Sequence, residues 1–165
     1  MFFDVKKLFS GEEECLAFDY EMDLSSTIIN TVKPFTTPIR VQGQICSNAG
    51  APQLHADVTF GFSIPCDRCT AQIDREYRYS FDHGLVPTLN EEDNDFYLVV
   101  EDGVLDLDEL IRSDILLELP TKYLCSSDCK GLCPICGANQ NQETCACNTR
   151  QIDPRLEILK QLIDE

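Results

Sequence analysis

The chain has 165 residues, which is enough for one domain with a hydrophobic core and a small metal-stabilised appendage but crowded for two full domains. Its 29 acidic and 13 basic residues give a formal net charge of -16, so the overall field repels a nucleic-acid backbone and favours basic protein partners. No apolar run has the length of a signal peptide or of a membrane-spanning helix. We therefore expect a cytoplasmic protein without a membrane partner.

Alternating apolar and polar residues predict β-strands in the first half of the chain. The runs with this period cover residues 16–22, 39–45, 54–64 and 73–81. We also expect a short helix over residues 4–9 that ends before Gly11, and a turn over residues 48–52. The strand at 54–64 runs directly into Cys66 and Cys69, and another strand follows. These two cysteines should therefore lie at the tip of a hairpin.

The second half of the chain is acidic and contains one predicted helix before the cysteine cluster. Residues 85–119 contain eleven acids and a single base, Arg112. A short buried strand is expected over residues 96–100 after a loop at 87–95. Asp106 has the position of an N-cap, and a helix should run from there to Pro120. The acidic run is interpreted either as a solvated face or as a docking surface for a basic partner.

Cysteines are concentrated near the C-terminal end, where six of the ten lie between Cys125 and Cys147. In a reducing compartment such a density indicates metal ligands before disulfides. Thiolates are soft ligands that suit zinc, and a Cys-x-x-Cys turn brings two sulfurs to one tetrahedral ion. Cys133 and Cys136 form such a turn, in which Gly137 is free to take a positive φ.

Eight cysteines divide into two groups of four, and each group is expected to hold one structural zinc ion. The first group joins the hairpin to the tail and consists of Cys66, Cys69, Cys125 and Cys129. The second group lies wholly in the tail and consists of Cys133, Cys136, Cys145 and Cys147. The two remaining cysteines, Cys15 and Cys46, fall in predicted strands, where we expect small buried thiols without a function.

Two rival interpretations of the cysteines stay open. Cys66-x-x-Cys69 could be a redox pair, although such pairs usually open a helix, where the helix dipole lowers the thiol pKa. The spacing of Cys129, Cys133 and Cys136 is that by which radical SAM enzymes hold an iron–sulfur cluster, although those enzymes are much larger. Closed four-thiolate sites leave no position for a substrate, and no phosphate loop or catalytic histidine motif occurs. We therefore expect no enzyme activity and no small-molecule substrate.

The predicted fold is α+β, with an antiparallel sheet or partial barrel, a few helices and a cysteine-rich zinc-knuckle region at the C-terminal end. The sheet and the acidic helix should form a domain over residues 1–120. Residues 121–165 should form the metal-binding tail, whose last helix begins at Pro154 and packs back on the domain.

The combination of these motifs resembles the YceD family, which is named for large ribosomal RNA subunit accumulation. The matching segments are Cys66 to Cys69, Asp106 to Pro120, Cys129 to Gly137, Asn139, Asn141, Cys145 to Cys147 and Asp153 to Leu156. The resemblance implies a role in the synthesis, processing or accumulation of large-subunit (23S) ribosomal RNA, and it brings no established catalytic residues.

Two kinds of partner are compatible with this resemblance. The acidity of the chain favours a basic large-subunit ribosomal protein or a pre-ribosomal particle. Alternatively, the protein could bind the 23S ribosomal RNA precursor directly, because several bases lie near the cysteines and binding requires positive charge collected on one face. These candidate RNA-binding residues are Arg68, Arg75, Arg78, Lys122 and Lys130.

Overall fold

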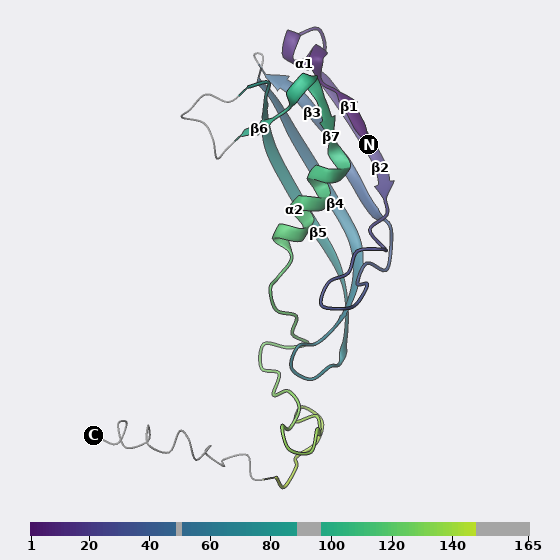
Figure 1. The fold of residues 1–165 in the computed structure, drawn as a ribbon, viewed down its shortest axis with the longest axis vertical. Helices are drawn as coiled ribbons and strands as arrows, with labels where there is room; N and C mark the ends of the chain where they lie inside the picture. Colours follow the sequence, from purple (N-terminus) through teal and green to yellow (C-terminus); the bar gives the residue numbers. More distant parts are fainter. Residues whose placement is uncertain (49–50, 89–96, 148–165) are drawn as a thin grey trace, which may run out of the picture. The chain divides into compact units, whose positions relative to one another are not determined.

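The computed structural model describes residues 1–48, 51–88 and 97–147 of the chain, shown in Figure 1. The chain divides into two compact units. The first contains Met1–Ile64 and Ile73–Thr121, and the second contains Pro65–Gln72 and the described part of Lys122–Glu165. The predicted C-terminal helix lies outside the described residues, and the domain division at residue 120 stays a prediction. Within the described ranges, no helix combines the length and the apolar composition that crossing a membrane requires.

The first unit is built on a five-stranded sheet in the order β2-β3-β4-β5-β6. Its strands are β2 (Cys15–Met22), β3 (Ile39–Asn48), β4 (Ala51–Pro65), β5 (Gln72–Val86) and β6 (Tyr97–Val99). The first three strands pair antiparallel, whereas β6 pairs parallel with β5. A small second sheet pairs β1 (Phe2–Asp4) with β7 (Val104–Asp106). The predicted α+β class is confirmed, and the sheet within the described residues is open and does not close into a barrel.

The alternation of apolar and polar residues correctly predicts which side chains of strand β4 are buried. Along β4 the six even-numbered residues from Leu54 to Ile64 are all buried, while their neighbours are exposed or half-buried. In β3, a side chain at Gly43 would collide with the carbonyl oxygen of His55 and with the ring of Phe18 on the adjacent strand. Phe18 therefore covers the backbone at this position, and glycine is required for the close approach of the strands.

Three short helical segments complete the first unit: α1 (Lys6–Ser10), the 3-10 helix η1 (Glu101–Gly103) and α2 (Leu107–Glu118). As predicted, the helix at the N-terminus ends before Gly11, whose φ is 75°. The predicted N-cap also forms, because the Asp106 carboxylate accepts a hydrogen bond from the Glu109 N–H at 3.4 Å. The buried face of α2 consists of Leu107, Ile111 and Ile115, which have no exposed surface.

The expectation that Cys15 and Cys46 are buried free thiols is wrong. A disulfide joins them across β2 and β3, with their Cα atoms 4.1 Å apart. The two cysteines are directly opposite in the strand register, Cys15 is exposed and Cys46 is half-buried. The same alternation that buries Phe18 places Cys15 on the opposite, solvent-facing side of its strand.

Two strand predictions also need correction. Ala51 and Pro52, which were expected in a turn, belong to strand β4, and Asn48 is the last residue of β3. The strand predicted as buried over residues 96–100 is an edge strand, β6, in which Tyr97 keeps 45% of its surface exposed. A single apolar run cannot distinguish a central strand from the edge of a sheet, since the number of neighbouring strands depends on the topology.

Candidate metal centres

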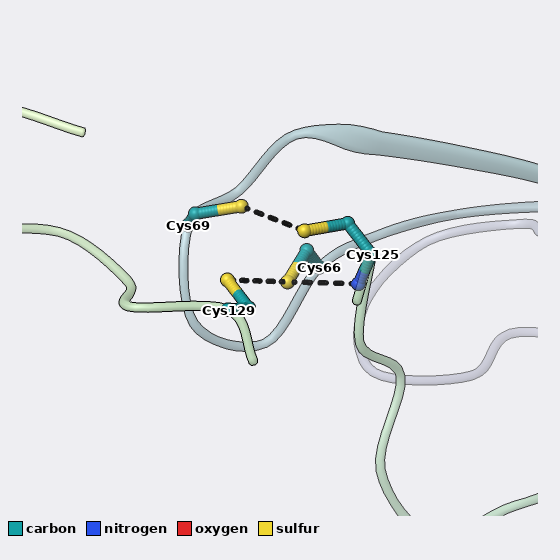
Figure 2. Close-up of side chains that lie close together, drawn as sticks. All are labelled: Cys66, Cys69, Cys125 and Cys129. Carbon is teal, nitrogen blue, oxygen red and sulfur yellow. Dashed lines mark hydrogen bonds between the residues drawn. The ribbon is translucent and has the colours of Figure 1, made fainter. Parts of the chain in front are cut away.

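The first cysteine group lies entirely within the second unit. Cys66 and Cys69 come from the turn between β4 and β5, as predicted, and Cys125 and Cys129 come from the segment after α2. Figure 2 shows that the four sulfurs converge. Cys66 Sγ is 3.8 Å from Cys129 Sγ, and Cys69 Sγ is 3.5 Å from Cys125 Sγ.

The turn that carries this group is held by short backbone hydrogen bonds. The N–H of Cys66 donates to Ala71 O at 2.8 Å, and Thr70 adopts a φ of 59° to close the turn. Asp67 then pairs with Tyr123 in both directions, because its N–H donates to Tyr123 O at 2.8 Å and its carboxylate accepts from Tyr123 N–H at 2.7 Å. This double contact places Cys125, two residues further on, beside the turn.

The sulfur geometry suits a tetrahedral metal ion. Zinc–sulfur bonds of about 2.3 Å imply sulfur–sulfur separations of about 3.8 Å in a regular tetrahedron. All four sulfurs of the first group lie within 4.8 Å of one another, and the two closest contacts approach the tetrahedral separation. The first group can therefore hold one ion with all coordination positions filled by sulfur.

The second group consists of Cys133, Cys136, Cys145 and Cys147, whose sulfurs also lie within 4.8 Å of one another. Its first pair forms a tight knuckle, in which Gly137 N–H donates to Cys133 O at 2.9 Å. Gly137 has a φ of 75°, in agreement with the prediction from the sequence. The structure thus assembles the same two sets of four that the sequence predicted, and each can hold a metal ion.

Thiol acidity differs within each group. Burial raises the pKa of the Cys66 thiol, but backbone N–H donors, first that of Cys125, outweigh burial and lower this pKa to about 6. Backbone N–H groups, first that of Cys136, likewise lower the pKa of Cys133 to about 6. The hydrogen bond with the Cys69 thiol raises the pKa of Cys125 to about 12. In the second group, the hydrogen bond with the Cys136 thiol likewise raises the pKa of Cys147 to about 12. Each group thus combines an acidic thiol with one that resists ionisation, and a bound divalent cation would favour the ionised form of all four.

Thiols also supply most of the buried interior of the second unit. Of its described residues, the buried apolar side chains are Cys66, Cys69, Cys129, Cys133 and Tyr123. Sulfurs brought together in this way form a poor hydrophobic core, because they offer little apolar surface and repel one another when ionised. The donor set therefore fits a metal that stabilises this unit, and zinc is the ion that four thiolates suit best.

The rival three-cysteine cluster does not form as one group. Cys129 lies with the hairpin cysteines, whereas Cys133 and Cys136 lie with Cys145 and Cys147. The redox interpretation of Cys66 and Cys69 also loses its expected context, since the pair is followed by strand β5 and not by a helix.

Two polar residues that were not predicted to act at this site support the first group. Asp67 anchors Tyr123, and the Asn141 carboxamide donates through Nδ2 to Cys129 Sγ at 3.3 Å. The resemblance to the YceD family includes Asn141 but assigns it no role. Its position between Cys136 and Cys145 in the chain was the available signal, because residues near metal-binding cysteines commonly hydrogen-bond to the thiolates.

The predicted basic residues are divided between the two units. Arg68, Lys122 and Lys130 belong to the second unit, and Arg75 and Arg78 belong to the first. Arg68 Nη1 donates to Cys129 O at 2.9 Å, so this side chain also supports the metal group. The Arg78 guanidinium pairs with Glu76 at 2.6 Å. A common RNA-binding surface for all five residues stays a prediction.

A hairpin Cys-x-x-Cys pair that meets two cysteines from a later segment, with a second four-cysteine group beside it in the sequence, defines a protein with paired candidate metal centres. The family model described as large ribosomal RNA subunit accumulation protein YceD matches residues 54–163, a range of this chain that contains all eight of these cysteines. The chain belongs to the YceD family, and the resemblance drawn from the sequence is confirmed.

The chain is also similar in sequence to individual proteins. YlbN of Bacillus subtilis is 26% identical over 167 residues, which cover 98% of this chain and 95% of that protein. The chloroplastic large ribosomal RNA subunit accumulation protein YCED homolog 1 of Zea mays is 36% identical over 61 residues, or 36% of this chain and 21% of the maize protein. The Arabidopsis thaliana homolog 1 is 39% identical over 49 residues, covering 30% and 15% respectively. The matched regions are thus small parts of the plant proteins, and no solved structure matches the chain significantly.

Proposed function

We propose that this protein is a non-enzymatic factor in the biogenesis of the large ribosomal subunit, and that it acts in the cytoplasm. It supports the synthesis, processing or accumulation of 23S ribosomal RNA by contacting a basic ribosomal protein within a precursor particle. The observation that carries this proposal is the match of residues 54–163 to a family named for large ribosomal RNA subunit accumulation.

A structural role for the metal supports the non-enzymatic part of the proposal. We infer that each four-cysteine group binds one zinc ion, and four sulfur ligands leave no coordination position for water or substrate. Mass spectrometry under native conditions should find two zinc ions per chain. A mass without bound metal, or a brown preparation that contains iron, would contradict this assignment.

Contact with a protein is favoured over contact with RNA by charge. A net charge of -16 repels phosphate at long range and attracts basic ribosomal proteins, which raises the rate of encounter. The alternative, direct binding to precursor RNA, requires local bases such as Lys122 and Lys130, which are both exposed.

Depletion of the protein from cells tests the proposed function. We expect a lower ratio of 23S to 16S ribosomal RNA and an accumulation of incomplete large-subunit particles in sucrose gradients. Unchanged rRNA ratios and gradients after depletion would contradict a role in this pathway.

Affinity purification with and without nuclease then separates the two kinds of partner. A basic ribosomal protein that stays bound after nuclease treatment would support contact with protein. Loss of all partners with nuclease, together with loss of RNA binding in a Lys122→Glu, Lys130→Glu variant, would instead support direct RNA binding. Salt dependence of that RNA binding should fall in the same variant.

A further inference from the structure

Two neighbouring hollows lie around the N-terminal turn of α2 in the first unit. The first hollow has a volume of about 400 Å³ and is mainly apolar. Leu98 and Val99 of β6, Val104 of β7 and Leu110 of α2 contribute to its walls. Val104 keeps 44% of its surface exposed, so apolar surface is accessible at this position.

The second hollow has a volume of about 540 Å³ and is strongly acidic. Five carboxylates line it, from Glu21, Asp23, Asp106, Asp108 and Glu109. Two cations oppose them. The Arg112 guanidinium pairs with Glu109 at 3.1 Å, and the Met1 ammonium contacts Asp108 and lies 3.6 Å from Asp106. Negative charge therefore remains in excess, and Met22 and Leu24 add apolar surface at its edge.

The two hollows adjoin at Asp106 and Glu109, which line both of them, and together they are treated as one surface. One side of this surface is apolar and the other is acidic. An apolar patch bordered by a single sign of charge is typical of a site for an amphipathic partner of the opposite charge. The surrounding segment strengthens the field, since residues 97–119 contain seven acids and a single base.

We propose that this surface, defined by the two hollows around Asp106 and Glu109, binds a basic amphipathic segment of a partner protein. Apolar side chains of the segment enter the hollow beside Leu98 and Val104, and its lysines or arginines face the carboxylates of the second hollow. The proposal rests on the proposed function, in which the partner is a basic ribosomal protein, and it names the surface that makes the contact.

Charge favours a basic peptide segment on this surface over a second copy of the chain or a nucleic acid. A second copy of the chain carries a net charge of -16 and would be repelled from an acidic surface. A nucleic acid would meet the same repulsion and has no apolar face to fill the first hollow. A cationic, amphipathic polypeptide satisfies both halves of the surface.

Binding of a model peptide tests the surface directly. The probe is a fluorescein-labelled helical peptide with leucines on one face and lysines on the other, and its Kd is measured by fluorescence anisotropy. Neutralisation in a Glu21→Gln, Glu109→Gln variant should weaken binding about tenfold at low salt, because two attractive charges are lost. Leu98→Thr with Val104→Thr should weaken binding by a similar factor through loss of apolar contact.

Matched controls exclude an effect of net charge or misfolding. A Glu12→Gln, Glu14→Gln variant loses the same charge away from both hollows and should bind as the wild type does. A peptide of the same composition in scrambled order should bind weakly. The proposal is overturned if the scrambled peptide binds equally well, or if the surface variants keep wild-type affinity. A dimer that dissociates in the Leu98→Thr, Val104→Thr variant, seen by analytical ultracentrifugation, would overturn it in favour of a second copy.

Co-sedimentation with large-subunit precursors separates this proposal from the proposed function. If the wild type and both surface variants co-sediment equally, the surface assignment is wrong and the ribosomal role stands. If the wild type does not co-sediment but binds the peptide through this surface, the ribosomal role is wrong and the docking surface stands. Co-sedimentation that is lost specifically in the surface variants supports both.

Discussion

The carboxamide of Asn141 connects the two cysteine groups through a single side chain. It lies in the loop between Cys136 and Cys145, which belong to the second group, yet its Nδ2 donates to the sulfur of Cys129 in the first group. Its Oδ1 accepts from Lys130 N–H at 2.8 Å, which fixes the orientation of the amide. A hydrogen bond to a thiolate both orients the sulfur and disperses its charge.

Replacement of Asn141 should therefore weaken metal binding at the first group. We expect Asn141→Ala to lower zinc affinity there by about 10- to 100-fold, the usual effect of removing a hydrogen bond to a metal ligand. Competition with a chromogenic chelator measures this affinity, and a Cys145→Ser, Cys147→Ser background isolates the first group. Gln140→Ala is the control. The backbone N–H of Gln140 donates to Gly131 O, and alanine keeps this hydrogen bond. Equal affinities for the two variants would disprove the role of the amide.

At the scale of elements, a histidine–carboxylate pair joins helix α2 to strand β5. His83 Nε2 is 2.8 Å from Asp114 Oδ2, and the side chains keep 27% and 12% of their surface exposed. The hydrogen bond to Asp114 raises the pKa of His83 above its usual value. A folded-state pKa above the unfolded one means that the pair stabilises the fold below about pH 6.5 and that this stabilisation is lost as pH rises through the raised value.

The free energy of unfolding of the first unit should therefore fall as the pH rises from about 6 to about 8. Urea unfolding at the two pH values measures the change. Asp114→Asn removes the charge that raises the pKa and should reduce the pH dependence, with a loss of about 1.5 kcal/mol at the lower pH. The exposed pair of His55 and Asp82 acts in the same direction, so Asp82→Asn is the comparison variant. A pH dependence that is unchanged in Asp114→Asn would contradict this assignment.

The packing of α2 gives a second prediction for this element. Ile111 has no exposed surface, whereas Leu117 on the same helix keeps 84% of its surface exposed. Ile111→Ala should lower the free energy of unfolding by about 2–5 kcal/mol, since it removes buried methyl groups and leaves a cavity. Leu117→Ala removes an apolar group of the same size from a water-exposed side chain and should change stability by about 0.5 kcal/mol or less. Chemical denaturation of the two variants checks the difference.

Local patterns predicted the elements well where one face is buried. The alternation along β4 and the Asp106 cap of α2 required no knowledge of the rest of the chain. The errors occurred where the outcome depends on strand partners. The Cys15–Cys46 disulfide forms because β2 and β3 pair in one particular register, and β6 is an edge strand because it comes last in the strand order of the described residues. Neither pairing can be read from a single segment.

For the molecule as a whole, the spacing of the cysteines predicted both groups of four, but it did not predict the polar residues that form hydrogen bonds around them. Soft ligands in knuckles have a strong signature, so both groups of four could be assigned from the sequence. The roles of Asp67, which binds the backbone of Tyr123, and of Asn141, which binds the sulfur of Cys129, could not be assigned, because nearness to cysteines in the chain does not identify which polar side chain makes such a contact. The surface defined by the two hollows around Asp106 and Glu109 combines side chains from β2, β6, β7 and α2. These elements come together only when the chain folds.

The two units should also differ in what stabilises them. The first unit buries long apolar stripes, such as that from Leu54 to Ile64, so its core consists of apolar side chains. In the described part of the second unit, the buried apolar side chains are four cysteines and Tyr123. Binding of a structural zinc ion contributes on the order of 10–16 kcal/mol in small domains, so an ion bound at each cysteine group would be the main source of stability for this unit.

Removal of metal should therefore unfold the second unit and leave the first folded. After treatment with a strong chelator, hydrogen exchange followed by mass spectrometry should show lost protection in residues 65–72 and 122–147. Protection along β3 and β4 should persist, because their hydrogen bonds lie in a sheet with an apolar core. Added zinc should restore the lost protection, while a Cys133→Ser, Cys136→Ser variant should recover it only at the first group. Simultaneous loss of protection in both units would show that the sheet also depends on the metal.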